Sequence, residues 1–180
     1  IPLRLVGSEM CIRDSLGIGQ GYILATPLQL AMAYSGLANK GVIYQPQFIQ
    51  PEDEKSFEPK KVAEIQLSDN KSWEKMEQAL VDVISARNGT AHKVFDANSA
   101  VIAGKTGTAQ IKSILPGKEY DAIRENPALR DHALFVGYGP VKDPKLVVAV
   151  IIENGESGSE VAAPIVKSAI NFFTGGFDAE

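Results

Sequence analysis

The spacing of hydrophobic positions predicts three helices. The first covers 27–40, with Thr26 as its N-cap, and it is apolar almost all round, so we expect it to be buried. A second covers about 73–87 and a third about 160–173. Each of these two carries one apolar stripe. The stripes are Trp73, Met76, Leu80, Val83 and Ile84 in the second helix, and Val161, Ile165, Ala169, Ile170 and Phe173 in the third.

Three other segments have the pattern of β-strands, namely 100–111, 133–139 and 146–153. The last is a continuous apolar run, which is typical of a strand covered on both faces. Asp143-Pro144 forms a turn signal between the second and third strands. We therefore expect these two strands to pair antiparallel.

The remaining segments give weaker signals. Short strands are predicted at 42–49 and at 62–67, the second within the polar stretch 50–71. Residues 1–15 show no helical or strand period, and we interpret them as a leader that is foreign to the fold or disordered. Cys11 lies in that leader and receives no role.

Composition narrows the class of protein. The 180 residues are 44% hydrophobic and 22% charged, which suits one packed domain or a large part of one. The net charge is −4 without a long run of like charges, so neither a nucleic acid nor a membrane contact is indicated. The single cysteine excludes an internal disulfide and a multi-cysteine metal cluster.

The most informative chemistry lies in the predicted strand that contains Lys105, Thr106 and Gly107. Strand geometry places Lys105 and Gly107 on one face and Thr106 on the other. The flanking glycines leave room for a ligand near the backbone, and an ammonium with a hydroxyl suits a carboxylate. A free strand edge suits an extended peptide. The alternative is a surface lysine on an edge strand without any such role.

Lys-Thr-Gly on a strand is also a signature of the penicillin-recognising serine enzymes. Further blocks in the same order make the chain similar to the class B penicillin-binding proteins, most of all the elongation-type penicillin-binding protein 2 group. The resemblance covers about 16–175 and leaves 176–180 as a tail. Its blocks are GIGQGY (17–22), ATPLQLA (25–31), NGTAH (88–92), AGKTGTAQ (103–110), RDHALFVGYGP (130–140) and VAVIIENG (148–155).

The resemblance implies an α+β fold of the penicillin-binding transpeptidase and β-lactamase-like type. In this fold an antiparallel sheet carries helices on both faces. The chain would be the carboxy-terminal part of the domain, with three sheet strands, the last helix and part of the helical subdomain. Because the first two strands of the family precede the nucleophile, one sheet edge is expected to be open.

The resemblance also implies a D,D-transpeptidase that cross-links peptidoglycan through a serine acyl-enzyme, without a metal or other cofactor. Lys105 would supply positive charge and relay a proton, and Thr106 would bind the substrate carboxylate. Gly107 would permit close approach, and the N–H of Thr108 would be an oxyanion-hole donor. Expected partners are stem peptides, β-lactams and cell-elongation proteins, at the periplasmic face of a bacterial inner membrane to which an upstream segment anchors the enzyme.

The nucleophile motif of this family is expected upstream of the chain, so the fragment alone should be inactive. Ser68 and Ser72 each begin a Ser-x-x-Lys match, and Ser68-Asp69-Asn70 matches a second family motif. Both lie in a polar stretch before a helix, where a serine more often acts as a cap. Two alternatives to a transpeptidase remain open. One is a β-lactam hydrolase or D,D-carboxypeptidase, and the other is a non-catalytic penicillin-binding-like sensor or scaffold.

The other polar candidates are weaker. His92 and His132 are candidate acid–base groups that we interpret as hydrogen-bonded loop histidines preceding strands. Asp121 and Asp131 lack the paired spacing of metal ligands, and 119–131 is interpreted as a solvated excursion.

Overall fold

The computed structural model describes residues 24–49, 58–69, 71–95, 102–109 and 126–175. A three-stranded antiparallel sheet in the order β3-β4-β5 forms the centre of this part of the chain. The strands are β3 (Ala103–Ala109), β4 (His132–Gly139) and β5 (Leu146–Ile152). The antiparallel pairing of the last two confirms what the turn between them predicts.

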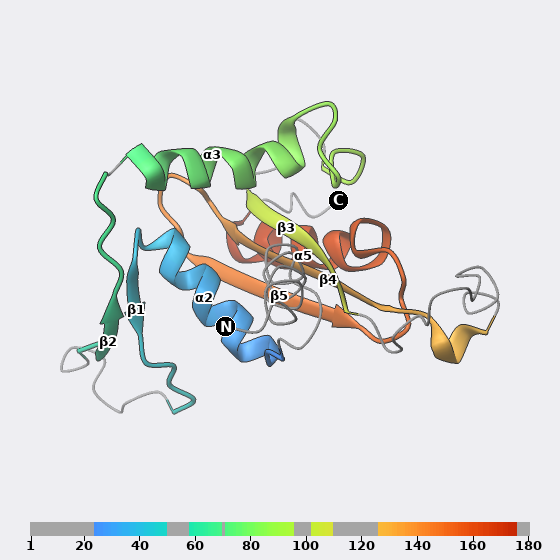
Figure 1. Cartoon of the computed structure of the whole chain (residues 1–180), viewed down its shortest axis with the longest axis horizontal. Helices are drawn as coiled ribbons and strands as arrows, with labels where there is room; N and C mark the ends of the chain where they lie inside the picture. The colour runs from blue at the N-terminus through green and yellow to red at the C-terminus, as the bar shows by residue number, and fades with distance from the viewer. Residues whose placement is uncertain (1–23, 50–57, 70, 96–101, 110–125, 176–180) are drawn as a thin grey trace, which may run out of the picture.

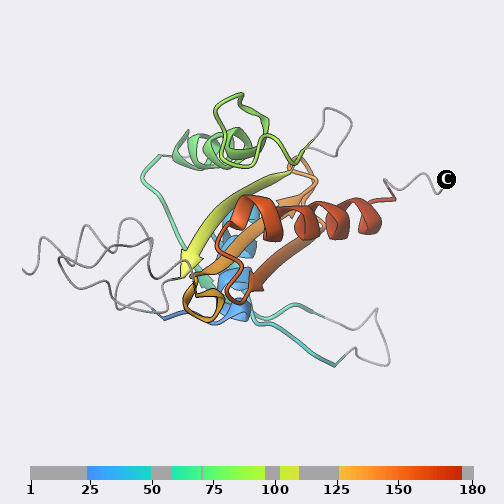
Figure 2. The same cartoon turned by 90° about the vertical axis from the view of Figure 1, so that its right-hand side faces the viewer.

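Helices lie on both faces of this sheet, with α2 (Pro27–Ala38) on one face and α5 (Ala163–Phe173) on the other (Figures 1 and 2). The helix α3 (Lys71–Ser85) runs beside β3, above the sheet in Figure 1. A short 3-10 helix, η2 (Pro127–Leu129), precedes β4, and one π-helical turn, η3 (Gly158–Ala162), precedes α5.

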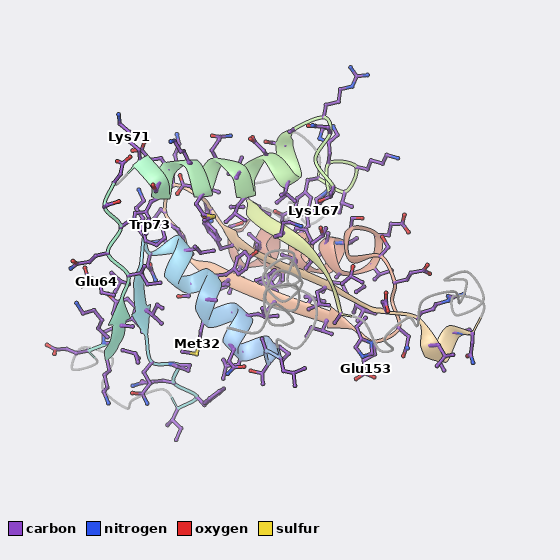
Figure 3. The ribbon with its side chains drawn as sticks, in the orientation of Figure 1. Met32, Glu64, Lys71, Trp73, Glu153 and Lys167 are labelled. Atoms are coloured by element: carbon purple, nitrogen blue, oxygen red, sulfur yellow. The ribbon has the colours of Figure 1, made fainter. Side chains whose placement is uncertain are left out.

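A second, two-stranded sheet stands apart from the first (Figure 1). It consists of β1 (Val42–Tyr44) and β2 (Lys61–Glu64), paired antiparallel. At its junction with α3, Trp73 packs against the turn at Gly41, where a Cβ would lie 2.8 Å from the indole Cζ2. Figure 3 shows Trp73 at the start of α3, beside β1 and α2.

The core has one cluster on each face of the central sheet. The larger cluster packs α5 and η3 against Phe135, with Ile84 from α3. Lys167 fastens α5 further, because its Nζ donates a hydrogen bond to the carbonyl oxygen of Val94 at 3.1 Å. The smaller cluster, on the α2 face, consists of Ala38, Leu80, Ala103, Tyr138 and Val141.

Two expectations about helix faces are wrong. Helix α2, expected to be buried, has only Gly36 and Ala38 buried, because the described residues cover just one of its sides. Helix α5 buries Ala163, Val166 and Ile170 rather than the predicted stripe, of which only Ile170 is buried and Val161, Ile165 and Phe173 are exposed. The helix carries two apolar stripes, and periodicity does not say which one meets the sheet.

Candidate active site

The strand β3 carries the Lys-Thr-Gly segment at the edge of the central sheet, as far as the described residues show. Its register places Lys105 opposite Val136 and Thr106 opposite Phe135. Lys105 therefore belongs to the α2 face and Thr106 to the α5 face, as strand alternation predicts. An edge strand turns every second pair of backbone N–H and C=O groups away from its neighbour, so these groups remain for a ligand.

The glycines of β3 are explained by what lies beside them. A Cβ at Gly104 would lie 2.7 Å from Cε1 of Phe135 and 2.9 Å from the carbonyl oxygen of Val136. Among the described residues, a Cβ at Gly107 would meet only the Cβ of Leu134, at 3.3 Å. Packing therefore requires a glycine at position 104. At position 107, which is half-buried, the glycine leaves the strand without a projecting side chain next to Lys105.

Lys105 is exposed, but its ammonium is held by the neighbouring residue. Its Nζ donates to the carbonyl oxygen of Thr106 at 3.0 Å and to the Oγ1 of the same residue at 3.2 Å. The ion pairs found among the described residues join other groups, so no described carboxylate neutralises Lys105. A cation and a hydroxyl thus lie together at an accessible strand edge, an arrangement that suits an anionic ligand.

A second hydroxyl, for which the sequence predicts no role, also reaches this point. The Oγ1 of Thr90 lies 3.4 Å from the Oγ1 of Thr106, although the two residues are 16 positions apart. Thr90 follows the end of α3, and the next residue, Ala91, is buried in the larger core cluster. Its occurrence in the NGTAH block was the only signal that could have pointed to it.

Thr108 lies on the same strand, opposite Ala133, and its side chain is exposed. The loop between β5 and α5 packs against this end of the sheet. A Cβ at Gly158 would collide with the carbonyl oxygen of Leu134 and would lie 3.0 Å from the carbonyl oxygen of Gly107. The first residue of η3 therefore packs against the backbone of β3 at Gly107, next to Thr108.

The two Ser-x-x-Lys matches do not form a comparable site. Ser68 and Ser72 are exposed, and no hydrogen bond among the described residues joins either hydroxyl to Lys71, Lys75 or Lys105. The side chain of Asp69 lies at the start of this helix, where its Oδ1 accepts the N–H of Lys71 at 2.9 Å.

The histidines occupy different environments. His92 lies in the turns after α3 rather than directly before a strand, and its Nδ1 is 3.3 Å from the carbonyl oxygen of Ile84. His132 begins β4, and its Nδ1 accepts the backbone N–H of Asn154 at 2.9 Å. Asp121 lies outside the described residues. Within the described ranges no three His, Cys, Asp or Glu side chains are grouped as metal ligands would be.

Two tyrosines on the α2 face of the sheet have raised pKa values because they are buried. On the α2 side, burial together with the charge of Glu77 raises the pKa of Tyr138 to about 12, so this phenol is protonated near neutral pH. Burial also raises the pKa of Tyr34 on α2. Neither phenol is suited to accept a proton at pH 7.

Comparison with known proteins places this geometry in a family. Residues 9–171 match the model of the penicillin binding protein transpeptidase domain. The chain is 39% identical over 164 residues to the peptidoglycan D,D-transpeptidase MrdA of Haemophilus influenzae, covering 88% of this chain and 25% of that protein. It is 37% identical over 150 residues to MrdA of Escherichia coli K12, covering 81% and 24%. The chain thus spans about a quarter of the length of these curated relatives.

Solved structures agree with this result. The chain superposes on Pseudomonas aeruginosa PBP2 in complex with WCK 5153 with a TM-score of 0.68 and 39% identity, covering 88% of this chain and 32% of that one. It superposes on the complex of Helicobacter pylori PBP2 and MreC with a TM-score of 0.67 and 28% identity, covering 91% and 28%. The antiparallel sheet between helices and the family match over 9–171 show that the chain belongs to the penicillin-binding protein transpeptidase domain family.

Proposed function

We propose that the chain forms the substrate-binding strand and its supports in a peptidoglycan D,D-transpeptidase. The observation that carries this proposal is the contact of the Lys105 ammonium with the Thr106 hydroxyl on an exposed strand edge. A stem peptide ending in D-Ala–D-Ala, or a β-lactam, would bind extended along β3 with its carboxylate at Lys105 and Thr106. The N–H of Thr108 would face the carbonyl oxygen under attack.

The covalent steps require a serine nucleophile, which we place in a segment beyond these 180 residues. Its Oγ attacks the carbonyl carbon of the D-Ala–D-Ala amide, the C–N bond breaks, and the departing nitrogen takes a proton as D-Ala leaves. An amine of a second stem peptide then attacks the ester, forms the cross-link and frees the serine. Lys105 stabilises the developing negative charge and relays a proton, while Thr106 and Gly107 position the substrate.

The cellular setting is proposed from the relatives. One structural relative is a complex of PBP2 with MreC, which supports cell-elongation proteins as partners of the enzyme containing this chain. We place that enzyme at the periplasmic face of a bacterial inner membrane, anchored by an upstream segment. Of the helices that the structure describes, none has the length and hydropathy needed to cross a bilayer.

A chimera tests the proposal directly. In it, this chain replaces the matching segment of the Haemophilus influenzae relative, and a fluorescent penicillin measures the second-order rate of acylation. The chimera should be labelled, whereas the isolated 180-residue chain should form no adduct. A folded chimera that is not labelled would contradict the proposal, and label mapped to Ser68 or Ser72 in the isolated chain would contradict the assignment of the nucleophile.

Lys105→Ala in the chimera should lower the acylation rate about 10²–10³-fold, the cost of losing one preorganised charge contact. Lys105→Arg should also be impaired, since a guanidinium is planar and stays protonated. Lys145→Ala is the matched control, because Lys145 is an exposed lysine that pairs with Asp143 in the β4–β5 turn. An acylation rate of Lys105→Ala within about twofold of wild type would refute a catalytic role. A large fall in the thermal midpoint of this variant, enough to explain the lost activity by unfolding, would also refute it. Steady hydrolysis of the label without cross-linking of stem peptides would favour a β-lactam hydrolase or carboxypeptidase.

A further inference from the structure

The hydrogen bond between His132 and Asn154 connects the start of β4 to the loop that follows β5. A backbone N–H can only donate, so the Nδ1 of His132 must be the unprotonated, accepting nitrogen in this contact. This contact therefore requires the tautomer whose proton is on Nε2. The two residues are 22 positions apart, which makes this a tertiary contact rather than a turn.

Two more hydrogen bonds hold the same loop, residues 154–158, against the start of β4. The Nδ2 of Asn154 donates to the carbonyl oxygen of Arg130 at 3.0 Å, and the N–H of Glu156 donates to the carbonyl oxygen of Asp131 at 2.9 Å. Asn154 and Glu156 have φ values of 56° and 64°, in the left-handed region that non-glycine residues rarely adopt. Such a conformation persists where surrounding contacts impose it.

The far end of this loop touches the substrate-binding strand. Gly158 lies so close to the carbonyl oxygens of Leu134 and Gly107 that no side chain fits there. His132 itself stands opposite Ala109, the last residue of β3. The loop is thus fixed at one end by His132 and abuts Gly107, next to Thr108, at the other.

We propose that His132 is a positioning residue that, through Asn154, holds the 154–158 loop against β3 and thereby fixes the backbone at Gly107 and Thr108. The part of this proposal that concerns acylation rests on the proposed transpeptidase function. The loop holds β3 most firmly while the Nδ1 of His132 accepts this hydrogen bond, in addition to the two bonds to Arg130 and Asp131. Protonation of His132 turns Nδ1 into a second donor facing the N–H of Asn154, which opens the contact.

Other charges near this contact must be considered in any pH experiment. Arg130 and Asp131 precede His132, and Glu153 and Glu156 flank Asn154 on the loop, where Figure 3 shows Glu153 at the end of β5. Arg130 and Glu156 lie 3.9 Å apart as an ion pair. No charged residue stands opposite His132 on β3, where its register partner is Ala109. Variants that differ only at His132 keep all of these groups unchanged.

The first test is hydrogen exchange in the chimera, which needs no catalysis. His132→Ala should speed exchange about two- to tenfold in peptides covering 153–158 and 103–109, the factor expected from one lost hydrogen bond. His132→Asn should exchange like wild type, because the Oδ1 of asparagine can accept at the position of Nδ1. His92→Asn is the matched control at the only other histidine. Faster exchange confined to 153–158, or no change in either peptide, would overturn the proposal.

The second test is the acylation rate between pH 5 and pH 8. His132→Ala should acylate about two- to tenfold more slowly at pH 8, and His132→Asn should restore the wild-type rate. On acidification the wild type and His92→Asn should slow relative to His132→Asn, which has no ring to protonate. A constant ratio of wild type to His132→Asn across this range would overturn the proposal. If the wild-type chimera is not acylated at all, the transpeptidase function fails, and the exchange experiment still decides the role of His132.

Discussion

The two faces of the central sheet are covered to different degrees. On the α5 face, Phe135, Val166 and Ile170 are completely buried, and η3 and α3 complete the packing. On the α2 face the buried cluster is smaller, and α2 itself is only half-buried, with Leu28 exposed to 41%. The difference teaches that the described residues seal one face by themselves. They cover the other face, which carries Lys105, less completely, because α2 buries only Gly36 and Ala38.

The largest expected effect comes from removing packing on the sealed face. Ile170→Ala should lower the free energy of unfolding by about 2–5 kcal/mol, as is typical of a fully buried isoleucine. Ile165→Ala is the matched control on the same helix, where the side chain is 46% exposed, and should cost much less. Urea unfolding of both variants measures the difference. Equal losses would mean that α5 buries both of its stripes and that the comparison of the faces is wrong.

The second prediction concerns Tyr138 beneath the α2 face, whose pKa burial raises to about 12 from the ordinary 10. Below pH 10 the phenol of Tyr138 is protonated in both the folded and the unfolded protein, so its ionisation does not make stability depend on pH. Between pH 10 and 12 the unfolded chain ionises first, so stability should fall, by no more than about 3 kcal/mol. Tyr138→Phe should lose less stability than wild type over this range in thermal melts. If the stability of wild type and of Tyr138→Phe falls in parallel between pH 10 and 12, the phenol is solvated and its pKa is not raised.

Gly104→Ala should cost about 1–3 kcal/mol, because the added methyl group meets the Phe135 ring and a backbone oxygen. Gly107→Ala, three residues along the same strand, has a single contact with the described residues, at 3.3 Å, and should cost less stability. The acylation rate of the chimera should nevertheless fall in Gly107→Ala, because the methyl group would occupy the proposed ligand side of the strand. Comparing thermal midpoints with acylation rates separates the two effects. The same loss of stability in both variants would contradict their assignment to packing and to ligand access.

The smallest effect is expected on the open side of α2. Leu28→Ser should change the free energy of unfolding by less than about 0.5 kcal/mol, as at other exposed positions without special contacts. Thermal melts at two protein concentrations measure it. A loss of 2 kcal/mol or more would show that α2 is covered in solution, and a concentration dependence would identify a second copy of the chain as the cover.

The sequence predicted the existence of α2, α3, α5 and the three central strands, because their hydrophobic runs and turn residues are local signals. It failed where the outcome depends on distant partners. The hydrophobic positions of α2 indicate which surface would be stabilised by burial, but not whether another segment covers that surface. The third helix was predicted to begin near 160, yet η3 intervenes and α5 begins at Ala163, one residue before Pro164.

The candidate site shows the same division. Lys105, Thr106, Gly107 and Thr108 were found because the motif is contiguous, and the roles given to them stay predictions. Thr90 and His132 matter only through contacts with residues 16 and 22 positions away, which no local pattern encodes. The Lys-Thr-Gly motif on β3 therefore indicated the chemistry, while the residues that support this strand could be identified only from the fold.

The contact of the Lys105 ammonium with Thr106 has a consequence for the entropy of the proposed ligand binding. A lysine side chain that is free in solvent loses up to about 2 kcal/mol of rotamer freedom when a ligand fixes it. Here the ammonium already rests on the carbonyl and hydroxyl oxygens of Thr106. A carboxylate bound as proposed would add to, or exchange with, an existing partner, so part of this ordering would precede binding. Affinity at this strand edge then depends on preorganisation as much as on charge.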